Sequence, residues 1–215
     1  MTLTVWGRKT SSNVQALMWC IGELRLDVQR HDIGHVHGGN DTPQFLAMNP
    51  NGTVPVLQDG ADEPIWETGA ILRYLAARYG TDSFWPADLT RRAEVDKWAE
   101  WAKINITLGF TGPVFWRVVR TAPSRRDPVA IAEALAKLER LFAIAEVQLS
   151  RQPFLAGDAF TLADIQFGHV LYRYFDIDIA RPYLPGIERY YKALTQRPAF
   201  AEHVMVSYEP LRVAD

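Results

Sequence analysis

A proline within a strand-like run, in the stretch of residues 49–57, constrains the fold more than any other feature of this chain. The run reads Asn-Pro-Asn-Gly-Thr-Val-Pro-Val-Leu. Pro55 has no N–H to give a sheet ladder, so the Val54–Pro55 bond marks either an edge strand or a cis peptide bond where a strand begins. We predict the cis bond, which turns Val54 out of the sheet and leaves its N–H and C=O free to pair with an extended peptide. Val54 and Pro55 are therefore candidate residues of a peptide-binding site.

A helix is expected to begin a little farther along, at Glu67 and Thr68. The N–H groups of its first turn lack partners within the helix and, together with the helix dipole, they favour a carboxylate. Thr68 is also explained as an N-cap and nothing more. The Val54–Pro55 bond and the helix start at Glu67 are each more often structural than functional when taken alone. Together they indicate a site for a short acidic peptide.

Alternating and helical periodicities predict a mixed first part of the chain. Strands are expected at residues 3–6, at 28–33, directly after Pro55 and at 65–66, and helices from about residue 13, over 43–48 and up to residue 79. The opening strand, helix and strand imply a parallel pair joined by a right-handed crossover. The predicted order is βαβαββα.

The rest of the chain is predicted to be helical. We expect a first domain over residues 1–80, a linker over 81–89 and an all-helical domain over 90–215. The linker is indicated by turn residues and a proline at the point where helical periodicity lapses. The fold class is therefore an α/β domain followed by an all-α domain.

Within the helical part, two long amphipathic helices are expected, from residue 91 to about 106 and over 128–150. Pro113 should end or kink any continuation of the first. Pro182 and Pro198 should each open a further short helix, because proline suits the first helical position.

Thr161 and Asp164 have the spacing of a helix N-terminus in which threonine caps and the acid three residues on returns a hydrogen bond. Phe160, directly before the cap, is available to staple the helix start. We therefore expect Asp164 to have a structural rather than a catalytic role.

Charge and composition exclude several classes of function. The formal net charge is −2, which gives no basic field for nucleic acid or for an anionic membrane. The first residues lack the pattern of a secretory leader, and no apolar run is long enough to span a bilayer. The single cysteine, Cys20, cannot form an internal disulfide. We expect a cytoplasmic protein that binds neither nucleic acid nor membrane.

With these motifs in place, the chain resembles the cytosolic glutathione S-transferases almost from end to end, and in particular the serine-type, bacterial theta- and zeta-like members. Two segments carry the resemblance. One is Asn-Pro-x-Gly-x-Val-Pro-x-Leu, and the other is similar to Glu-Ser-x-Ala-Ile-x-x-Tyr-Leu and begins at Glu67. The resemblance implies a thioredoxin-like first domain, in which Val54 pairs with the cysteinyl backbone of glutathione. Glu67 and Thr68 would hold the γ-glutamyl group.

The resemblance also implies a reaction. Glutathione, as co-substrate and without a metal, would be bound as its thiolate and would attack a small hydrophobic electrophile in a homodimeric detoxification enzyme. Two alternatives stay open at this stage. One is glutathione-dependent dehalogenation or isomerisation, and the other is a non-catalytic glutathione-binding or partner-binding module of the same fold.

The hydroxyl that activates the thiol is expected in the loop over residues 7–13, between the first strand and the first helix. The resemblance places Ser11 at the thiol-activating position, with Ser12 as the alternative and Asn13 as a secondary donor. Without the resemblance, a plain N-cap is the preferred interpretation of either serine. Cys20 lies two turns into the helix and is expected to be an inert core residue.

Two positions correspond to those that bind the glycyl carboxylate in relatives. They are Asn40 and Thr53. Many relatives carry lysine at the position of Thr53. Glutathione's glycyl end is therefore expected to be held more weakly, or by Lys9 or Arg8.

The resemblance implies that the electrophile's pocket lies where the first two long helices of the second domain face Ser11. The segment between residues 100 and 120 is rich in aromatic and apolar side chains that suit a hydrophobic acceptor. Arg117 and Arg120 could receive an acidic substrate, although a solvated helix face is the simpler interpretation. Tyr172 and Phe175 are weaker candidates. The principal candidates are Trp101, Ile104, Asn105, Leu108, Phe115 and Trp116, with Phe110 in the same segment.

A metal site is not expected. His31, Asp32, His35 and His37 lie close together in the sequence, but they fall in a glycine-rich loop without cysteine or a well-spaced third ligand.

Overall fold

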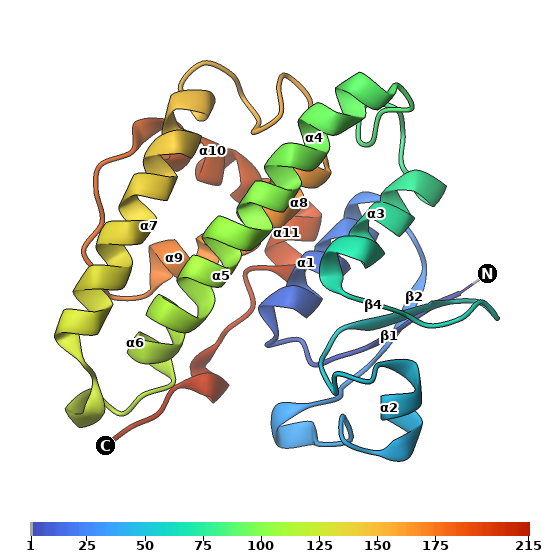
Figure 1. Cartoon of the computed structure of the whole chain (residues 1–215), viewed down its shortest axis with the longest axis horizontal. Coiled ribbons are helices and arrows are strands. Elements are labelled where there is room, and N and C mark those ends of the chain that lie inside the picture. The colour runs from blue at the N-terminus through green and yellow to red at the C-terminus, as the bar shows by residue number, and fades with distance from the viewer. Residues whose placement is uncertain (1) are drawn as a thin grey trace.

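A computed structural model describes residues 2–215 and shows a small sheet with helices beside a larger group of helices (Figure 1). The first part has the predicted βαβαββα order, which confirms a thioredoxin-like arrangement. Its elements are β1 (Leu3–Trp6), α1 (Ser12–Glu23), β2 (Val28–His31), α2 (Pro43–Met48), β3 (Val56–Asp59), β4 (Ile65–Trp66) and α3 (Thr68–Tyr79), with a short 3₁₀ turn, η1, at His35–His37.

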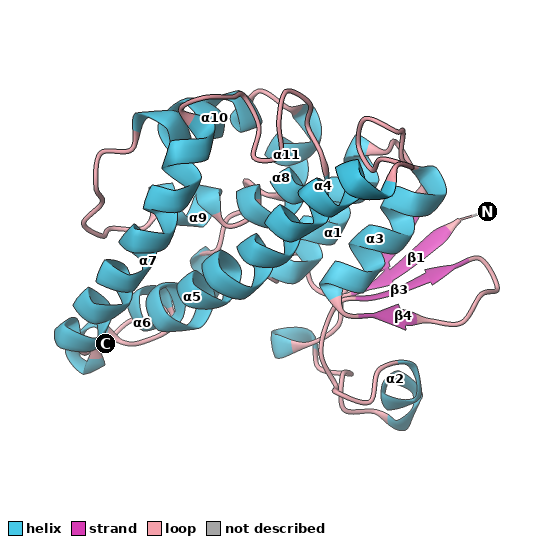
Figure 2. Cartoon of the chain, turned by 45° about the horizontal axis from the view of Figure 1, so that its top comes forward, coloured by secondary structure: helices cyan, strands magenta, loops and turns pink. Residues whose placement is uncertain are grey.

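The four strands form one sheet in the order β2-β1-β3-β4. Figure 2 shows β1, β3 and β4 side by side in this sheet. β1 runs parallel to β2, with Leu3 opposite Val28, so α1 serves as the crossover between them. β3 is antiparallel to β1 and β4 is antiparallel to β3. The inward residues of β1, Leu3 and Val5, are buried under the helices. β2 ends at His31, two residues before the predicted end.

The Val54–Pro55 peptide bond is cis, as predicted. Pro55 is buried directly before β3. Within residues 2–215 the backbone N–H and C=O of Val54 have no protein partner. The peptide group that we expected to be available for an added strand is therefore free.

The helical domain begins with one long helical path from α4 (Leu89–Trp101) to α6 (Arg117–Val119). Pro113 was expected to end or kink this helix, and it does not end it. Pro113 lies in a π-helical stretch, η3 (Thr111–Trp116), whose wider turns accommodate a residue that has no N–H to donate. The path also contains η2 (Ala102–Thr107), a second π-helical stretch, and α5 (Leu108–Phe110).

The other helices follow with short connections. Pro198 opens the last α-helix, as predicted. Pro182 lies in a loop, and the next helix begins at Pro185, which holds the first helical position instead. The predicted domain boundaries at residues 80 and 90 stay a prediction. The elements are η4 (Pro123–Arg125), α7 (Pro128–Leu149), α8 (Leu162–Gly168), α9 (Leu171–Asp176), α10 (Pro185–Thr195), α11 (Pro198–His203) and η5 (Glu209–Leu211).

The predicted cap at Thr161 and Asp164 is present at the start of α8. The buried Asp164 accepts hydrogen bonds from the Thr161 N–H at 2.8 Å, the Leu155 N–H at 3.0 Å and the Tyr190 hydroxyl at 2.9 Å. Burial raises the pKa of Asp164 to about 6, and these hydrogen bonds act against that rise. Asp164 therefore joins α8, the preceding loop and α10.

The two parts share one apolar core that runs through α1. α1 packs against α3 on the sheet side and against α8 and α11 in the helical domain. Trp19 of α1 is fully buried, with Phe160 and Phe200 against its ring. None of the helices within residues 2–215 is both long and apolar enough to cross a membrane.

Replacing Asp164 by Ala should lower the free energy of unfolding by about 3 kcal/mol, because the Tyr190 hydroxyl and two backbone N–H groups would lose their buried partner. Urea denaturation followed by circular dichroism measures this. Asp158→Ala, at an exposed position in the same loop, is the control and should change the value by less than about 0.5 kcal/mol. Equal midpoints for the two variants would contradict the structural role of Asp164.

Candidate active site

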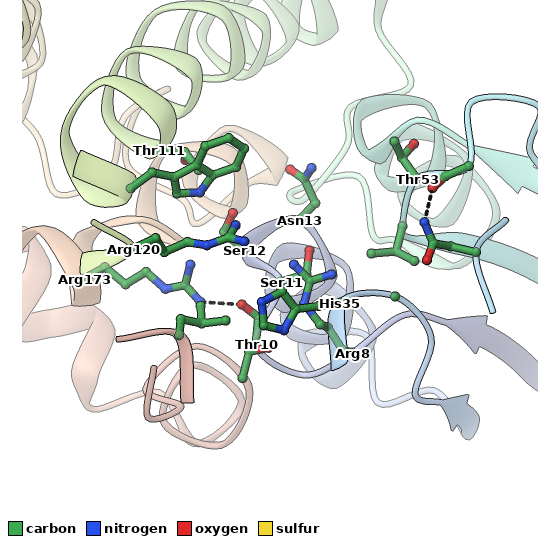
Figure 3. Close-up of a pocket in the computed structure, with 16 residues that line it drawn as sticks. Arg8, Thr10, Ser11, Ser12, Asn13, His35, Thr53, Thr111, Arg120 and Arg173 are labelled. Atoms are coloured by element: carbon green, nitrogen blue, oxygen red, sulfur yellow. Dashed lines mark hydrogen bonds between the residues drawn. The ribbon is translucent and has the colours of Figure 1, made fainter. Parts of the chain in front are cut away.

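A pocket of about 350 Å³ lies where the loop after β1 faces the helical domain (Figure 3). One side is formed by the start of α1 and by the loop before β3. The opposite side is formed by Thr111, Trp116 and Arg120 from the long helical path and by Arg173 from α9. Ser11, Ser12, Asn13, Asn40, Thr53, Val54 and Trp116, all predicted from the sequence, line this one pocket.

Ser11 occupies the N-cap position of α1, but its hydroxyl does not cap the helix. Its backbone is extended (φ −82°, ψ 125°), and its carbonyl accepts the Gln15 N–H at 2.9 Å. The side chain is about nine-tenths buried and lines the pocket. The plain N-cap interpretation therefore leaves the hydroxyl unexplained, and Ser11 has a donor to offer a ligand beside the unpartnered N–H groups of the first helical turn.

Asn13 is fixed by a residue that the sequence did not single out. Lys103, on η2, donates from Nζ to Asn13 Oδ1 at 2.8 Å. This contact occupies the amide oxygen and leaves the Asn13 amide N–H groups for other partners. Burial lowers the pKa of Lys103, and the nearby Glu67 carboxylate opposes that change. Asn13 and Lys103 lie 90 positions apart, so no local pattern connects them.

The predicted peptide-binding residues lie beside the serines. The Asn40 amide donates to the Gly52 carbonyl at 2.7 Å, and Thr53 Oγ1 accepts from Asn49 Nδ2 at 3.3 Å. Both contacts hold the loop that presents Val54.

Pro55, Glu67 and Thr68 are not among the residues that line this pocket. Glu67 has a left-handed backbone (φ 71°) that turns the chain into α3, and Thr68 is buried in the first turn of that helix. Their expected contacts with a γ-glutamyl group stay a prediction.

Of the two cations expected near a glycyl carboxylate, only Arg8 lines the pocket. Lys9 lines a separate depression with Arg30 and His203, and its N–H donates to Asp32 at 3.3 Å. Lys9 is therefore corrected from a candidate ligand to a residue outside this site.

Positive charge is concentrated in the pocket to an extent that the sequence did not reveal. Arg8, Arg120 and Arg173 line it together with His35, and the described lining includes no carboxylate. Burial, and then the charge of Arg120, lowers the pKa of Arg8. Burial, and then the charge of Arg8, lowers the pKa of Arg173 to about 10. Burial lowers the pKa of His35 as well, with Arg8 and Arg120 adding to the effect.

Arg173 could have been suspected from its neighbours. It interrupts the apolar run Val-Leu-Tyr-Arg-Tyr-Phe of residues 170–175. A charged side chain in such a run is rarely buried unless it has a partner or a function. It is 3% exposed, and its Nη2 donates to the Thr10 carbonyl at 2.8 Å. Its Nε has no partner within the described chain.

Among the predicted acceptor residues, Trp116 lines the pocket and is about half exposed. Phe115 is fully buried, beneath the Arg173 guanidinium at 4.7 Å and against Tyr208. The expectation that Phe115 contacts substrate is therefore wrong, because it points to the core. Phe110, which is also fully buried, is core too.

The other predicted acceptor residues lie on the same helical path but do not line the pocket. Trp101 packs on Trp98 and Phe167. Asn105 donates its amide to the Trp101 carbonyl at 3.0 Å. Ile104 and Leu108 are both more than half exposed, and their role in binding an acceptor stays a prediction.

The histidine-rich loop does not gather metal ligands. His37 Nε2 lies 4.0 Å from Asp32 Oδ1, and within residues 2–215 no group of three His, Cys, Asp or Glu side chains is placed to hold an ion.

The chain is similar in sequence and structure to known glutathione S-transferases. A family model for the N-terminal domain of glutathione S-transferase matches residues 1–77, and one for the C-terminal domain matches residues 111–198. Glutathione S-transferase GstB of Escherichia coli is 37% identical, covering 95% of this chain and 98% of the relative. Glutathione S-transferase 3 of Zea mays is 33% identical, covering 94% and 93% of the respective chains.

Among solved structures, the theta class glutathione S-transferase of Xanthomonas axonopodis pv. citri with glutathione bound superimposes with a TM-score of 0.90. It is 41% identical over 95% of this chain and 98% of that chain.

Cys20 is fully buried in α1, and burial raises the pKa of its thiol. It should therefore not react with a chromogenic aryl disulfide over an hour in the native protein, and one equivalent should react after denaturation. Rapid reaction in the native state would contradict its placement in the core.

Proposed function

The chain belongs to the glutathione S-transferase family, and on that premise we propose that it binds glutathione in the pocket at the start of α1 and activates its thiol for attack on an electrophile. The observation that carries this proposal is the Ser11 hydroxyl. It stands at a helix N-cap without capping the helix and lines the pocket.

The energetic requirement is modest. An unperturbed thiol has a pKa of about 8.5, and lowering it by about two units requires about 2.7 kcal/mol of preferential thiolate stabilisation. A hydrogen bond to a charged group contributes about 1.5 to 3 kcal/mol, and a helix N-terminus adds up to about 1 kcal/mol. The Ser11 hydroxyl with the first-turn N–H groups of α1 therefore suffices. The Asn13 amide, held by Lys103, is a second donor on the same helix turn.

The backbone of glutathione would extend from the Val54 peptide group, whose N–H and C=O are free, toward Glu67 and Thr68 at the start of α3. The glycyl carboxylate would be bound by Arg8, with Asn40 and Thr53 shaping the loop around it. Ser12, which also lines the pocket, is the alternative thiol donor.

In the reaction, the thiol proton leaves to solvent and the thiolate sulfur forms a bond to an electrophilic carbon. In a substitution the leaving group departs with the electron pair of its former bond. In an addition to an activated alkene no group leaves, the π electron pair of the double bond moves onto the adjacent carbon, and that carbon is protonated. Dehalogenation is the same substitution with halide as the leaving group.

We further propose that two copies of the chain associate as a homodimer, as family members typically do. Sedimentation equilibrium measures this directly. A species of twice the 24.4 kDa chain mass is expected, and a stable monomer would contradict it.

Ser11→Ala should lower kcat/KM for conjugation about thirtyfold, equivalent to about 2 kcal/mol of lost thiolate and transition-state stabilisation. The measurement is steady-state conjugation of glutathione to an activated aryl chloride. Ser12→Ala is the matched control and should change the value by less than about threefold. Full activity in both variants would refute this assignment, and glutathione binding without turnover by the unmodified protein would favour a non-catalytic module.

Lys103→Met should reduce kcat/KM about fivefold, because the Asn13 amide loses the contact that orients it. Asn13→Ala should have a similar effect, and the double variant should be no worse than either single one, because both remove the same donor. Lys97→Met, on the exposed side of α4 where it pairs with Glu94, is the control. Additive losses in the double variant would show that Lys103 acts independently of Asn13.

A further inference from the structure

Two arginines, Arg120 and Arg173, line the helical-domain side of the pocket. Arg120 follows α6 with its guanidinium carbon 5.1 Å from the centre of the Trp116 ring. Arg173 is 3% exposed, with its guanidinium carbon 4.7 Å from the Phe115 ring centre. Within residues 2–215 neither forms an ion pair with a carboxylate.

Such an arrangement is costly unless an anion is bound. A buried guanidinium without a counter-charge loses hydration, and neighbouring cations repel one another. The structure offers Arg173 only the Thr10 carbonyl and an aromatic face, and leaves its Nε without a partner. Aromatic faces hold both cations in place but do not cancel their charge. A bound anion would supply the missing counter-charge.

Glutathione does not account for all of the positive charge. In the proposed binding mode its γ-glutamyl end lies toward α3, which leaves the glycyl carboxylate and the thiolate, two negative charges, in a pocket with three arginines. Arg8 comes from the glutathione side, from the loop after β1, whereas Arg120 and Arg173 come from the helical domain with Trp116 (Figure 3). Figure 3 shows the Arg120 side chain extending toward Ser11 and Ser12, where the reacting sulfur would lie.

We infer that the acceptor substrate is a small electrophile that carries a carboxylate, bound by Arg120 and Arg173 with its apolar body against Trp116. This inference rests on the proposed function and names its substrate class. It differs from the small hydrophobic electrophile that the resemblance implies, and it takes up the alternative that Arg120 receives an acidic substrate. Planar guanidinium groups match a carboxylate with paired N–H donors, which also fixes the electrophilic carbon relative to the sulfur.

A matched pair of substrates tests the inference. Chloronitrobenzoate and chloronitrobenzamide, with chlorine para to the carboxylate or carboxamide and nitro ortho to chlorine, have the same reacting carbon and leaving group. In each, the glutathione sulfur bonds to the ring carbon, chloride leaves with the electron pair of the C–Cl bond and the thiol proton goes to solvent. The quantity compared is kcat/KM divided by the spontaneous rate constant, which removes the intrinsic difference in reactivity.

The charged substrate should be favoured about tenfold or more in this ratio. Arg120→Gln should abolish most of the preference through a higher KM for the benzoate, with the KM for glutathione changed less than about twofold. Arg117→Gln is the control, because Arg117 is exposed one turn earlier, does not line the pocket and donates to the Ala130 carbonyl. It should keep the preference of the unmodified protein.

Each failure has a distinct signature. Equal turnover of the two substrates would overturn the inference and leave the proposed function standing. A loss in Arg120→Gln that appears only in the KM for glutathione would also overturn it, because the arginine would then serve the glycyl carboxylate or the thiolate. If neither substrate reacts, this pair does not report the preference, and the proposed function is judged separately by conjugation of other electrophiles. The inference is then decided by calorimetric binding of meta-nitrobenzoate and meta-nitrobenzamide in the presence of S-methylglutathione. About tenfold tighter binding of the benzoate supports the inference, and equal binding overturns it.

Discussion

The site depends on the way in which helix α1 is held between the sheet and the helical domain. Trp19 in its middle is fully buried and donates from Nε1 to Glu23 at 2.8 Å, and Glu23 in turn accepts two hydrogen bonds from Arg197 at 2.7 and 2.6 Å. Arg197 lies before α11 with its guanidinium carbon 3.8 Å from the Phe160 ring centre. The C-terminal end of α1 is therefore tied to the helical domain by a chain of charged and aromatic contacts.

The N-terminal end of the same helix is tied to the helical domain by two cations. Lys103 bonds to Asn13, and Arg173 bonds to the Thr10 carbonyl. With both ends fixed, the position of Ser11 relative to the opposite wall is set by packing and by hydrogen bonds from the helical domain, and not by the loop alone. This is the preorganisation that thiolate stabilisation requires, since a donor that must be ordered at the moment of reaction contributes less. Arg173, which helps to position the loop, also adds positive charge to the pocket.

Sequence patterns predicted the structural features that depend on residues close together in the chain. The cis proline, the βαβαββα order and the cap of Asp164 each follow from residues within a few positions of one another. The partners of Asn13 and Thr10 lie 90 and 163 positions away, so local periodicity could not find Lys103 or Arg173. The aromatic content of residues 100–120 does not distinguish side chains that face the pocket from those in the core, so it could not place the fully buried Phe115.

The most direct test of the central claim, that the pocket at the start of α1 creates a thiolate, is an ultraviolet titration of glutathione bound to the protein. Thiolate absorbance near 240 nm, an approximate wavelength, is followed from acid to alkaline pH. The account predicts a bound thiol pKa of about 6 to 7, with absorbance that rises well below the range of the free thiol. A bound thiol that titrates near its usual value of about 8.5 would contradict it, because the unpaired hydroxyl, the helix N-terminus and the surrounding arginines would then have no effect on the sulfur.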